Sequence, residues 1–455
     1  MWVVFTYYSG LFIIMEKFFD RMKSLLGDEY DNFIEFYNKD KFYRGLRVNT
    51  LKCSADKLSE LIGFELKKTP FCGDGFYIPE NIETLGNSPL HHAGAFYIQE
   101  PSATSAVTML NVKEGDKVLD LCAAPGGKSS QIAAALGGRG LLWSNEIVKS
   151  RSIILLSNIE RMGVKNAVVS NSHPDKLCER LSGYFDKALV DAPCSGEGMF
   201  RKNSSAETEW SVEHVRSCAA RQLSILNSAK NALKSGGELV YSTCTFSVEE
   251  NEGVITEFLK ENPDFEIVDS KVNFGRKILE YGRRIFPMDG GEGHFAVKLR
   301  KNSDTFSPYI RNNINKVPDN IYEFYDENFT GRPFGGNGNI EIIGNNIFVV
   351  PENLPDVSGL NVLRKGVLLG EIKKNRIEPC HHAFMAAKPE QCVRAAEFDL
   401  NSDEIKRFLH GEEIQVNESL KGYTAVCVNG ITTGFGKASG GKLKNKYPKG
   451  LRTLK

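Results

Sequence analysis

The sequence has no excess of charge of either sign and no C-x-x-C pair. Its 57 Lys and Arg residues balance 57 Asp and Glu residues, so no global positive field draws the chain onto a polyanion. Any nucleic-acid contact must therefore come from local patches. The 10 cysteines are spread over all 455 residues. This spacing argues against a zinc ribbon and a disulfide framework, and it predicts a reducing, cytoplasmic setting.

The sequence also lacks a hydrophobic run of about 20 residues, the length needed to span a membrane. Residues 1–14 are apolar and aromatic but too short, and they lack the basic start and small-residue cleavage site of a signal peptide. We therefore predict no membrane contact. We interpret residues 1–14 as an upstream extension, with Met15 as the natural start. The alternative is a genuine N-terminal strand or helix.

Strand-like and helix-like segments alternate between residues 102 and 301. This alternation is typical of an α/β domain, in which helices cover both faces of a mostly parallel sheet. The expected strands lie near 117–122, 140–145, 166–170, 186–191 and 237–242. The expected helices lie near 129–136, 149–162, 208–234 and 247–261. Segments 284–286 and 294–299 then form a terminal hairpin, which favours a methyltransferase-type sheet over a dehydrogenase-type sheet.

The rest of the chain suggests two further domains. A small leading domain begins with two amphipathic helices between residues 15 and 37. Arg44, Arg47 and Lys52 follow, and they either contact phosphate or lie on a solvated strand face. The predicted boundaries are 15–90 for the leading domain, 91–301 for the α/β core, 302–339 for a linker or start of the C-terminal region, and 340–455 for that region.

A glycine turn follows the first expected strand of the core. Glycine has no side chain to obstruct a ligand, and ligands of open α/β sheets bind at the carboxyl edge, where this turn lies. The candidate cofactor-binding residues of the turn are Cys122, Ala123, Ala124, Pro125, Gly126, Gly127 and Lys128. Glu146 follows the next strand, 20 positions after Gly126, where an acid can accept hydrogen bonds from both ribose hydroxyls. This spacing indicates an adenosine cofactor and nothing finer; a surface helix cap is the alternative for Glu146.

Cys194 and Cys244 each end an apolar run, at the carboxyl ends of two expected strands. Carbon 5 of cytosine is too weakly nucleophilic to take a methyl group from a sulfonium directly. A thiolate that adds to carbon 6 makes carbon 5 enamine-like, and this covalent route requires a cysteine. Two thiols at adjacent strand ends would supply a nucleophile and a helper, in either order. The ordinary alternative is a buried structural thiol.

Asp191 ends the strand that leads to Cys194. A carboxylic acid there could bind N3 of a pyrimidine and share the charge that develops during attack at carbon 6. Lys128 could orient Asp191. The alternatives are a loop cap for Asp191 and an exposed position at the start of a helix for Lys128.

Three segments resemble the motifs of the RNA cytosine-C5 methyltransferase family, the Nop2/Sun/Fmu group. They are D-L-C-A-A-P-G-G-K at 120–128, D-A-P-C-S-G-E-G at 191–198 and Y-S-T-C-T at 241–245. The resemblance extends over about 15–300, and the tail from residue 422 resembles the PUA-like end of the bacterial 16S ribosomal RNA branch. It implies an α/β, Rossmann-like core that depends on S-adenosyl-L-methionine, with a small N-terminal α+β domain and a C-terminal PUA-like α+β/β domain.

The resemblance also implies roles that the residues alone leave open. The Thr-Cys cysteine attacks in the RNA family, so Cys244 is the implied nucleophile. Cys194 would assist release of the enzyme from carbon 6, and Asp191 would contact both base and cofactor. Family members commonly carry an acid after the third strand, where this chain has Asn171-Ser172-His173-Pro174-Asp175. His173 is therefore placed at the cofactor by resemblance, with Asp175 as the alternative after a small shift.

The closing stretch, residues 437–455, holds seven Lys or Arg and no acid. The residues predicted to contact RNA are Arg47, Lys442, Lys444, Lys446, Lys449 and Arg452. Cys380, His381, His382 and Cys392 have the side chains of metal ligands, but adjacent histidines rarely reach one ion. We therefore expect them to be structural or to face RNA, and we predict no metal site.

These observations predict an enzyme that methylates carbon 5 of a cytidine in structured RNA. The expected partner is 16S ribosomal RNA or the small ribosomal subunit. One alternative is the same chemistry on transfer RNA. Another is an RNA-binding assembly factor with a vestigial active site, against which the intact Cys194, Cys244, Asp191 and Glu146 argue.

Overall fold

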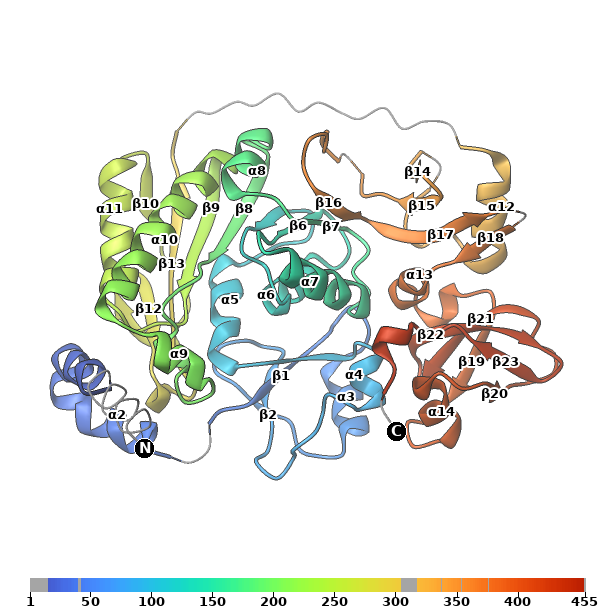
Figure 1. The fold of residues 1–455 in the computed structure, drawn as a ribbon, viewed down its shortest axis with the longest axis horizontal. Coiled ribbons are helices and arrows are strands. Elements are labelled where there is room, and N and C mark those ends of the chain that lie inside the picture. Colours follow the sequence, from blue (N-terminus) through green and yellow to red (C-terminus); the bar gives the residue numbers. More distant parts are fainter. Residues whose placement is uncertain are drawn as a thin grey trace, which may run out of the picture.

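The structure is a computed structural model of the 455-residue chain. It describes residues 15–39, 42–303, 317–336, 338–352, 354–374 and 376–453. The predicted extension 1–14 and part of the predicted linker, residues 304–316, lie outside the described residues. Figure 1 shows four parts: helices near the N-terminus, a small leading sheet, a large central sheet and two C-terminal sheets.

At the centre of the described residues is a 10-stranded sheet in the order β11-β12-β13-β9-β8-β5-β6-β7-β16, with β10 paired to β13. Its five middle strands are parallel, as predicted. They are β5 (Lys117–Asp120), β6 (Leu141–Asn145), β7 (Ala167–Ser170), β8 (Phe185–Asp191) and β9 (Leu233–Thr243). The predicted terminal hairpin is present as β12 (Gly282–Ile285) and β13 (His294–Lys301), extended by β10 (Phe265–Ile267) and β11 (Arg276–Ile278).

Helices cover both faces of this sheet because alternate strand residues point to opposite sides. Leu119 packs in the core with one set of helices, and its neighbour Val118 packs with the other. The first set is α8 (Pro174–Arg180), α10 (Val212–Ala232) and α11 (Val254–Glu261). The second set is α5 (Ser105–Leu110), α6 (Gly127–Leu136) and α7 (Lys149–Arg161).

The expected helix 208–234 is two helices. The short helix α9 (Ser204–Glu209) ends before Trp210, and α10 begins after Ser211, whose hydroxyl accepts a hydrogen bond from the backbone N–H of His214. A serine at this position is a typical N-cap, so it starts a new helix. The indole of Trp210 is buried, 1 % exposed, which holds the intervening chain against the core.

The leading domain has a four-stranded sheet in the order β2-β3-β1-β4. Its elements are β1 (Gly45–Val48), α3 (Ala55–Ile62), β2 (Lys67–Lys68), β3 (Gly75–Tyr77), α4 (Pro89–His92) and β4 (Phe96–Gln99). Because β4 pairs with β1, this sheet extends beyond the predicted boundary at residue 90. The predicted helices before it, residues 15–26 and α2 (Tyr30–Tyr37), pack instead against Phe200, Phe246 and Phe286 of the core.

The C-terminal region starts with α12 (Asp319–Asn328), which packs into a core with the two C-terminal sheets, so part of the predicted linker is folded. The first sheet contains β14 (Ile340–Ile343), β15 (Asn346–Val349), β17 (Val367–Lys373) and β18 (Arg376–Pro379), and α13 (His381–Ala386) follows. The second contains β19 (Ala395–Phe398), β20 (Ile414–Gln415), β21 (Gly422–Val428), β22 (Ile431–Ser439) and β23 (Lys442–Asn445), with α14 (Asp403–His410).

One strand of the C-terminal region, β16 (Val362–Lys365), crosses to the central sheet and pairs antiparallel with β7. Among the described residues, no helix is both long and apolar enough for a membrane span.

Candidate active site

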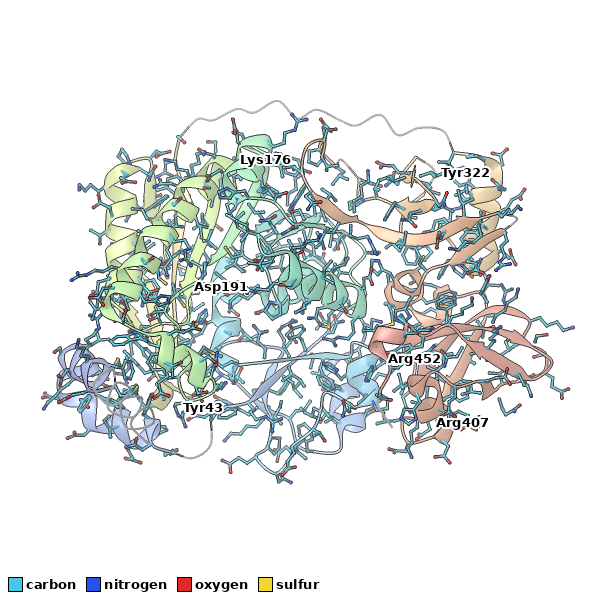
Figure 2. All side chains as sticks on the ribbon, in the orientation of Figure 1. Tyr43, Lys176, Asp191, Tyr322, Arg407 and Arg452 are labelled. Carbon is cyan, nitrogen blue, oxygen red and sulfur yellow. The ribbon has the colours of Figure 1, made fainter. Side chains whose placement is uncertain are left out.

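The predicted thiols meet at the carboxyl edge of the central sheet. Parallel strands β8 and β9 end at Asp191 and Thr243, so the turns that follow them lie side by side. The Sγ atoms of Cys194 and Cys244 are 3.3 Å apart, and both thiols are free. Figure 2 shows Asp191 at this edge, in the middle of the molecule. The prediction that the two cysteines share one site is confirmed.

Asp191 is held as a carboxylate between two donors. Lys128 Nζ donates to its Oδ2 at 2.8 Å, and Ser242 Oγ donates to its Oδ1 at 2.7 Å. Burial alone would raise the pKa of Asp191, but the charge of Lys128, the neighbouring His294 and these hydrogen bonds hold it below its usual value. Lys128 thus contacts Asp191, in agreement with the expected ion pair. The contact of Asp191 with N3 of a base stays a prediction.

The two thiols are not equivalent. The hydrogen bond to Cys244, then burial and the charges of Cys244 and Glu250, raise the pKa of Cys194 well above its ordinary value. Cys194 therefore keeps its proton. Burial opposes the charge on Lys128, but Asp191 and then Cys244 raise its pKa, so an ammonium group faces both Asp191 and Cys244. The assignment of Cys244 as the attacking thiol stays a prediction from the family resemblance.

Two buried carboxylates hold the two turns together, and the sequence analysis identified neither of them. Glu250, from the π-helical turn Glu249–Gly253, accepts hydrogen bonds from Ser195 N at 2.9 Å, from Ser195 Oγ and from Gln222 Nε2 at 2.8 Å. Glu197, from the Cys194 segment, accepts from Phe246 N and from the Trp210 indole N–H. Each turn thus supplies a carboxylate that fixes the other. In the sequence, Glu197 stands within the motif at 191–198, and Glu250 stands beside a second acid, Glu249.

His294 is a second residue that sequence reasoning missed. It begins β13, and Phe295 pairs with Thr243, which places His294 beside the turn that carries Cys244. Its Nε2 lies 3.9 Å from Asp191 Oδ1. The ring is 2 % exposed, and neither ring nitrogen has a hydrogen-bond partner within the described ranges. Burial, aided by Lys128, lowers the pKa of His294 to about 4, so the ring is neutral.

The glycine turn 122–128 connects β5 to α6, as predicted. Gly126 has φ +114, in the left-handed region that glycine favours. A side chain on Gly127 would crowd Tyr97 Cε1 and Gln99 Cδ, each 3.2 Å from an added Cβ. Ala123 and Ala124 are buried, Pro125 is exposed, and burial raises the pKa of the half-buried Cys122 thiol well above its usual value. Gly126 is therefore needed for its backbone conformation, and Gly127 is needed for close packing against Tyr97 and Gln99.

Arg47 corrects two expectations. It was predicted to contact RNA or to lie on a solvated strand face, but it is 1 % exposed. Its Nη2 donates to Ser130 Oγ at 2.6 Å and to the Gly127 carbonyl at 3.2 Å. Burial lowers its pKa to about 10, so it stays charged at neutral pH. Arg47 thus fixes the glycine turn from below and cannot reach a phosphate at the surface.

Three features of this edge fit S-adenosylmethionine. Glu146 is 3 % exposed, lies directly after β6 and keeps one oxygen 3.3 Å from Arg151 Nη1. Ile147 beside it is 52 % exposed and offers apolar surface to an adenine ring. Asp120 Oδ1 is buried without a partner within the described ranges, which suits the ammonium of the cofactor's amino acid. Burial raises the pKa of Asp120 to about 7.

His173 lies at the N-terminus of α8 and is exposed. Its Nδ1 is 3.5 Å from Asp175 Oδ2, and Asp175 accepts a hydrogen bond from Ser228 Oγ of α10. Asp175 is therefore tied to the neighbouring helix, but both side chains face solvent, with 61 % of His173 and 64 % of Asp175 exposed. Contact of His173 with a cofactor remains a prediction.

Acidic side chains offset part of the positive charge of the C-terminal stretch. Lys444 and Lys449 are exposed. Lys442 Nζ lies 3.5 Å from a Glu413 carboxylate oxygen, and Lys446 Nζ lies 3.7 Å from Glu378. Arg452 is half-buried and donates to the Tyr447 carbonyl at 3.3 Å. These acids, Glu413 and Glu378, come from outside the stretch, which contains no acidic residue. Arg452 makes its hydrogen bond within the same domain.

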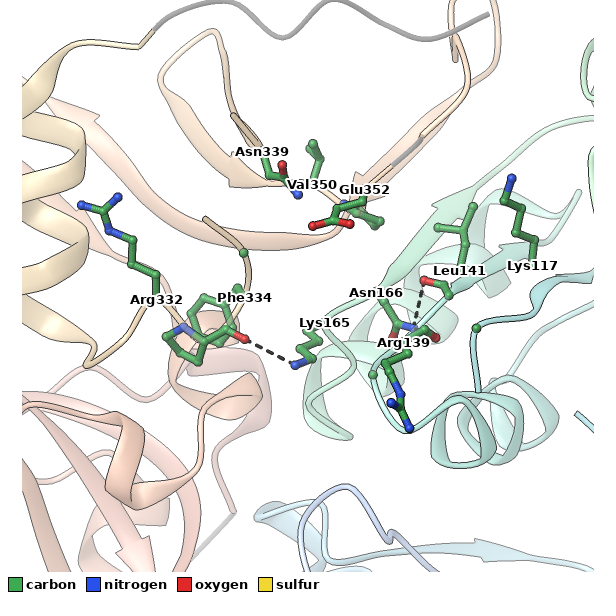
Figure 3. Close-up of a pocket in the computed structure, with 16 residues that line it drawn as sticks. Lys117, Arg139, Leu141, Lys165, Asn166, Arg332, Phe334, Asn339, Val350 and Glu352 are labelled. Carbon is green, nitrogen blue, oxygen red and sulfur yellow. Dashed lines mark hydrogen bonds between the residues drawn. The ribbon is translucent and has the colours of Figure 1, made fainter. Parts of the chain in front are cut away.

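Two other groups of residues lie apart from the thiols. His382 is buried between Arg364 Nη1 and the Val164 carbonyl, 3.1 Å from each, so it joins α13 to the core. In the described part of the chain, no cluster of three potential metal ligands is present. A pocket of about 580 Å³ lies at the opposite, amino edge of the sheet, lined by Lys117, Leu141 and Asn166 together with residues 332–335, 339 and 350–352 (Figure 3). None of the predicted site residues lines it.

The fold and the glycine turn at its carboxyl edge define a Rossmann-like methyltransferase that uses S-adenosylmethionine. A family model described as "16S rRNA methyltransferase RsmB/F" matches residues 107–300. The RsmF N-terminal domain matches 14–101, the first RsmF C-terminal domain matches 323–386, and the RsmF PUA domain matches 395–453. The chain belongs to the RsmB/F family of 16S rRNA methyltransferases.

Similar proteins agree with this assignment. Ribosomal RNA small subunit methyltransferase F of Vibrio vulnificus strain YJ016 is 35 % identical over 96 % of this chain and 97 % of its own. The crystal structure of a methyltransferase homologue from Pyrococcus horikoshii is 30 % identical with a TM-score of 0.57, covering 65 % of this chain and 99 % of that one. NSun6 from Pyrococcus horikoshii, solved with the S-adenosylmethionine analogue SFG, is 23 % identical with a TM-score of 0.56 over 63 % and 98 % of the chains. This last likeness shows the fold alone.

Proposed function

We propose that this chain methylates carbon 5 of a cytidine in 16S ribosomal RNA through a transient bond between Cys244 and carbon 6. The observation that carries the proposal is the pair of thiols 3.3 Å apart beside the Lys128–Asp191 ion pair. S-adenosylmethionine supplies the electrophilic methyl group. The turn 122–128, Glu146 and Asp120 are the residues that would hold it.

The residues divide the work as follows. The Lys128 ammonium faces Cys244, and in the attacking form the sulfur electron pair of Cys244 forms the bond to carbon 6 while a ring electron pair moves to carbon 5. Asp191, as a carboxylate, accepts a hydrogen bond from an N–H of the activated base. After methylation, the carbon 5 proton passes to solvent water, its bonding electron pair forms the carbon 5–carbon 6 double bond, and the carbon 6–sulfur bond breaks with its electron pair on Cys244. Cys194, protonated and in contact with that sulfur, protonates the departing thiolate and assists its release.

The target cytidine must leave its stack to reach both thiols. The leading domain (15–99) and the PUA-like region would hold the surrounding RNA, with Lys442, Lys444, Lys446 and Lys449 as phosphate contacts. His173 would lie near the cofactor. All 10 cysteines are free, which suits action in the cytoplasm.

The test is methyl transfer from labelled S-adenosylmethionine to purified small-subunit RNA, to assembled small subunits and to bulk transfer RNA, with bisulfite sequencing of the products. The proposal expects 5-methylcytidine in the small-subunit RNA and none in transfer RNA. Methylation of transfer RNA alone would overturn the substrate assignment. Cofactor binding without methyl incorporation into any of the three would indicate an RNA-binding factor with a vestigial site.

A further inference from the structure

A pocket of about 690 Å³ lies next to the catalytic turns, between the segment after α2, the edge of the leading sheet and the core. The core contributes Arg201 and Gly290. Arg201 follows the Cys194 turn, and its Nη1 binds Glu292 at 3.0 Å. The loop 290–293 then reaches the other turn, because a Cβ added to Gly198 would lie 2.9 Å from the Cys244 carbonyl and 3.1 Å from the Gly293 carbonyl. The loop 290–293 therefore connects the pocket to the turn that carries Cys244.

The pocket is rich in aromatic rings, although its position is at the surface. Phe42 is 41 % exposed, so its ring is accessible from solvent. Lys202 Nζ lies 5.1 Å from the centroid of its ring. Tyr43 and Tyr77 lie beside each other with ring centroids 5.8 Å apart, and the Tyr77 hydroxyl donates to the Gly290 carbonyl at 2.8 Å. That hydrogen bond fixes the aromatic wall to the catalytic loop.

The charge of the pocket is positive. Its lining includes four cations, Lys39, Arg44, Lys67 and Arg201, and two carboxylates, Glu65 and Glu80. Lys67 lies on the exposed edge strand β2, and Arg44 is anchored by hydrogen bonds to the Ile82 and Glu83 carbonyls. Aromatic rings next to cations are the combination that binds single-stranded nucleic acid, since bases stack on the rings and phosphates pair with the cations.

We propose that this pocket, defined by Phe42, Tyr43, Tyr77, Arg44 and Lys67, is a subsite for single-stranded RNA that holds a nucleotide adjacent to the target cytidine. The inference rests on the proposed RNA substrate and names where the strand runs. A flipped base leaves its neighbours without a stacking partner, and a ring beside the catalytic turn replaces that partner. Duplex RNA does not fit, because its bases are stacked and paired and cannot reach Phe42.

The test uses the full chain with Cys244→Ala, so that binding is measured without turnover. A fluorescein-labelled single-stranded RNA of ten nucleotides with one central cytidine is titrated by anisotropy. Phe42→Ala and Phe42→Leu each raise Kd by about 5-fold to 150-fold, the range for loss of one stacked base, whereas Phe42→Trp stays within about 3-fold of the parent. Ile343→Ala is the matched control, because Ile343 is 49 % exposed on β14 and should change nothing.

Lys67→Gln provides the second measurement. It lowers the slope of log Kd against log salt by about 0.7, the value for one phosphate contact on a single strand. Unchanged affinity in Phe42→Ala, or Phe42→Leu binding as well as Phe42→Trp, would overturn the subsite. If the wild-type chain methylates RNA but Phe42→Ala has normal affinity, only this inference fails. If the subsite variants behave as expected while the wild type methylates nothing, only the proposed function fails.

Discussion

Glu250→Gln tests whether a buried carboxylate, and not the thiols alone, sets the geometry of the active site. Glu250 is 0 % exposed and accepts hydrogen bonds from Ser195 N, Ser195 Oγ and Gln222 Nε2. A glutamine keeps the shape but replaces one acceptor oxygen with a donor. Gln222 cannot turn over to compensate, because its Nε2 also donates to the Pro193 carbonyl at 3.0 Å, and an Oε1 in that place would face another acceptor.

The substitution therefore replaces three hydrogen bonds to a charged carboxylate with bonds to a neutral amide, which costs about 1–3 kcal/mol of unfolding free energy in total. It also removes one of the negative charges that raise the pKa of Cys194; the larger causes are the hydrogen bond to Cys244 and burial. The pKa of Cys194 should fall, so its alkylation by iodoacetamide should begin at lower pH. Urea unfolding and mass spectrometry of the Cys194 peptide measure the two effects.

Glu249→Gln is the control, because Glu249 pairs with Arg21 at the surface and is 38 % exposed. It should lower the free energy of unfolding by less than about 1 kcal/mol, as for an exposed ion pair, and leave Cys194 alkylation unchanged. Equal behaviour of the two variants would refute the bracing role of Glu250. So would a Glu250→Gln protein with parental stability and parental alkylation.

Three further predictions concern the cofactor edge and the base. Burial raises the pKa of Asp120 to about 7 from 3.8, so the group is ionised and able to pair with an ammonium only above that pH. Calorimetric affinity for S-adenosylmethionine should rise as pH increases through about 7, and Asp120→Asn should bind weakly with no such rise. Arg47→Ala should lower cofactor affinity and cost about 3 kcal/mol of unfolding free energy, because it removes a buried charged donor; its RNA salt slope should stay unchanged, and a shallower slope would restore the discarded phosphate role. His294→Phe should raise KM for RNA while the cofactor Kd stays constant, because neither ring nitrogen has a hydrogen-bond partner within the described ranges and the ring lies near Cys244. Weaker cofactor binding with an unchanged KM for RNA would contradict this.

The central sheet was predictable because local patterns repeat there. Alternation of buried strands with amphipathic helices located β5 to β9, and α6 and α7 begin and end within two residues of the predicted limits. β16 was not predictable, because it joins β7 from almost two hundred residues further along the chain and depends on tertiary packing. The same reason explains β4, whose pairing with β1 moves the end of the leading sheet from residue 90 to residue 99.

The proximity of Cys194, Cys244 and Asp191 was predictable because these residues end or follow strands, and parallel strands bring such positions together. The residues that hold these positions in place were not predictable. Glu250 contacts Ser195 across 55 positions, and no local pattern marks it as an acceptor. The sequence suggested a surface position for Arg47, because a single charge on a short strand gives no sign that its guanidinium reaches the glycine turn 80 residues away. Lys442 and Lys446 read as unopposed because Glu413 and Glu378 are distant in sequence.

The bond between Cys244 and the pyrimidine is the claim on which the mechanism depends. Cys194→Ala protein is incubated with small-subunit RNA and S-adenosylmethionine, digested with trypsin and nuclease, and its peptides are sequenced by tandem mass spectrometry. The mechanism predicts a methylated cytidine nucleotide attached to the peptide at Cys244, and no such adduct when Cys244→Ala is added. A nucleotide attached to another residue, or methylation at the wild-type rate by the Cys244→Ala protein, would contradict it.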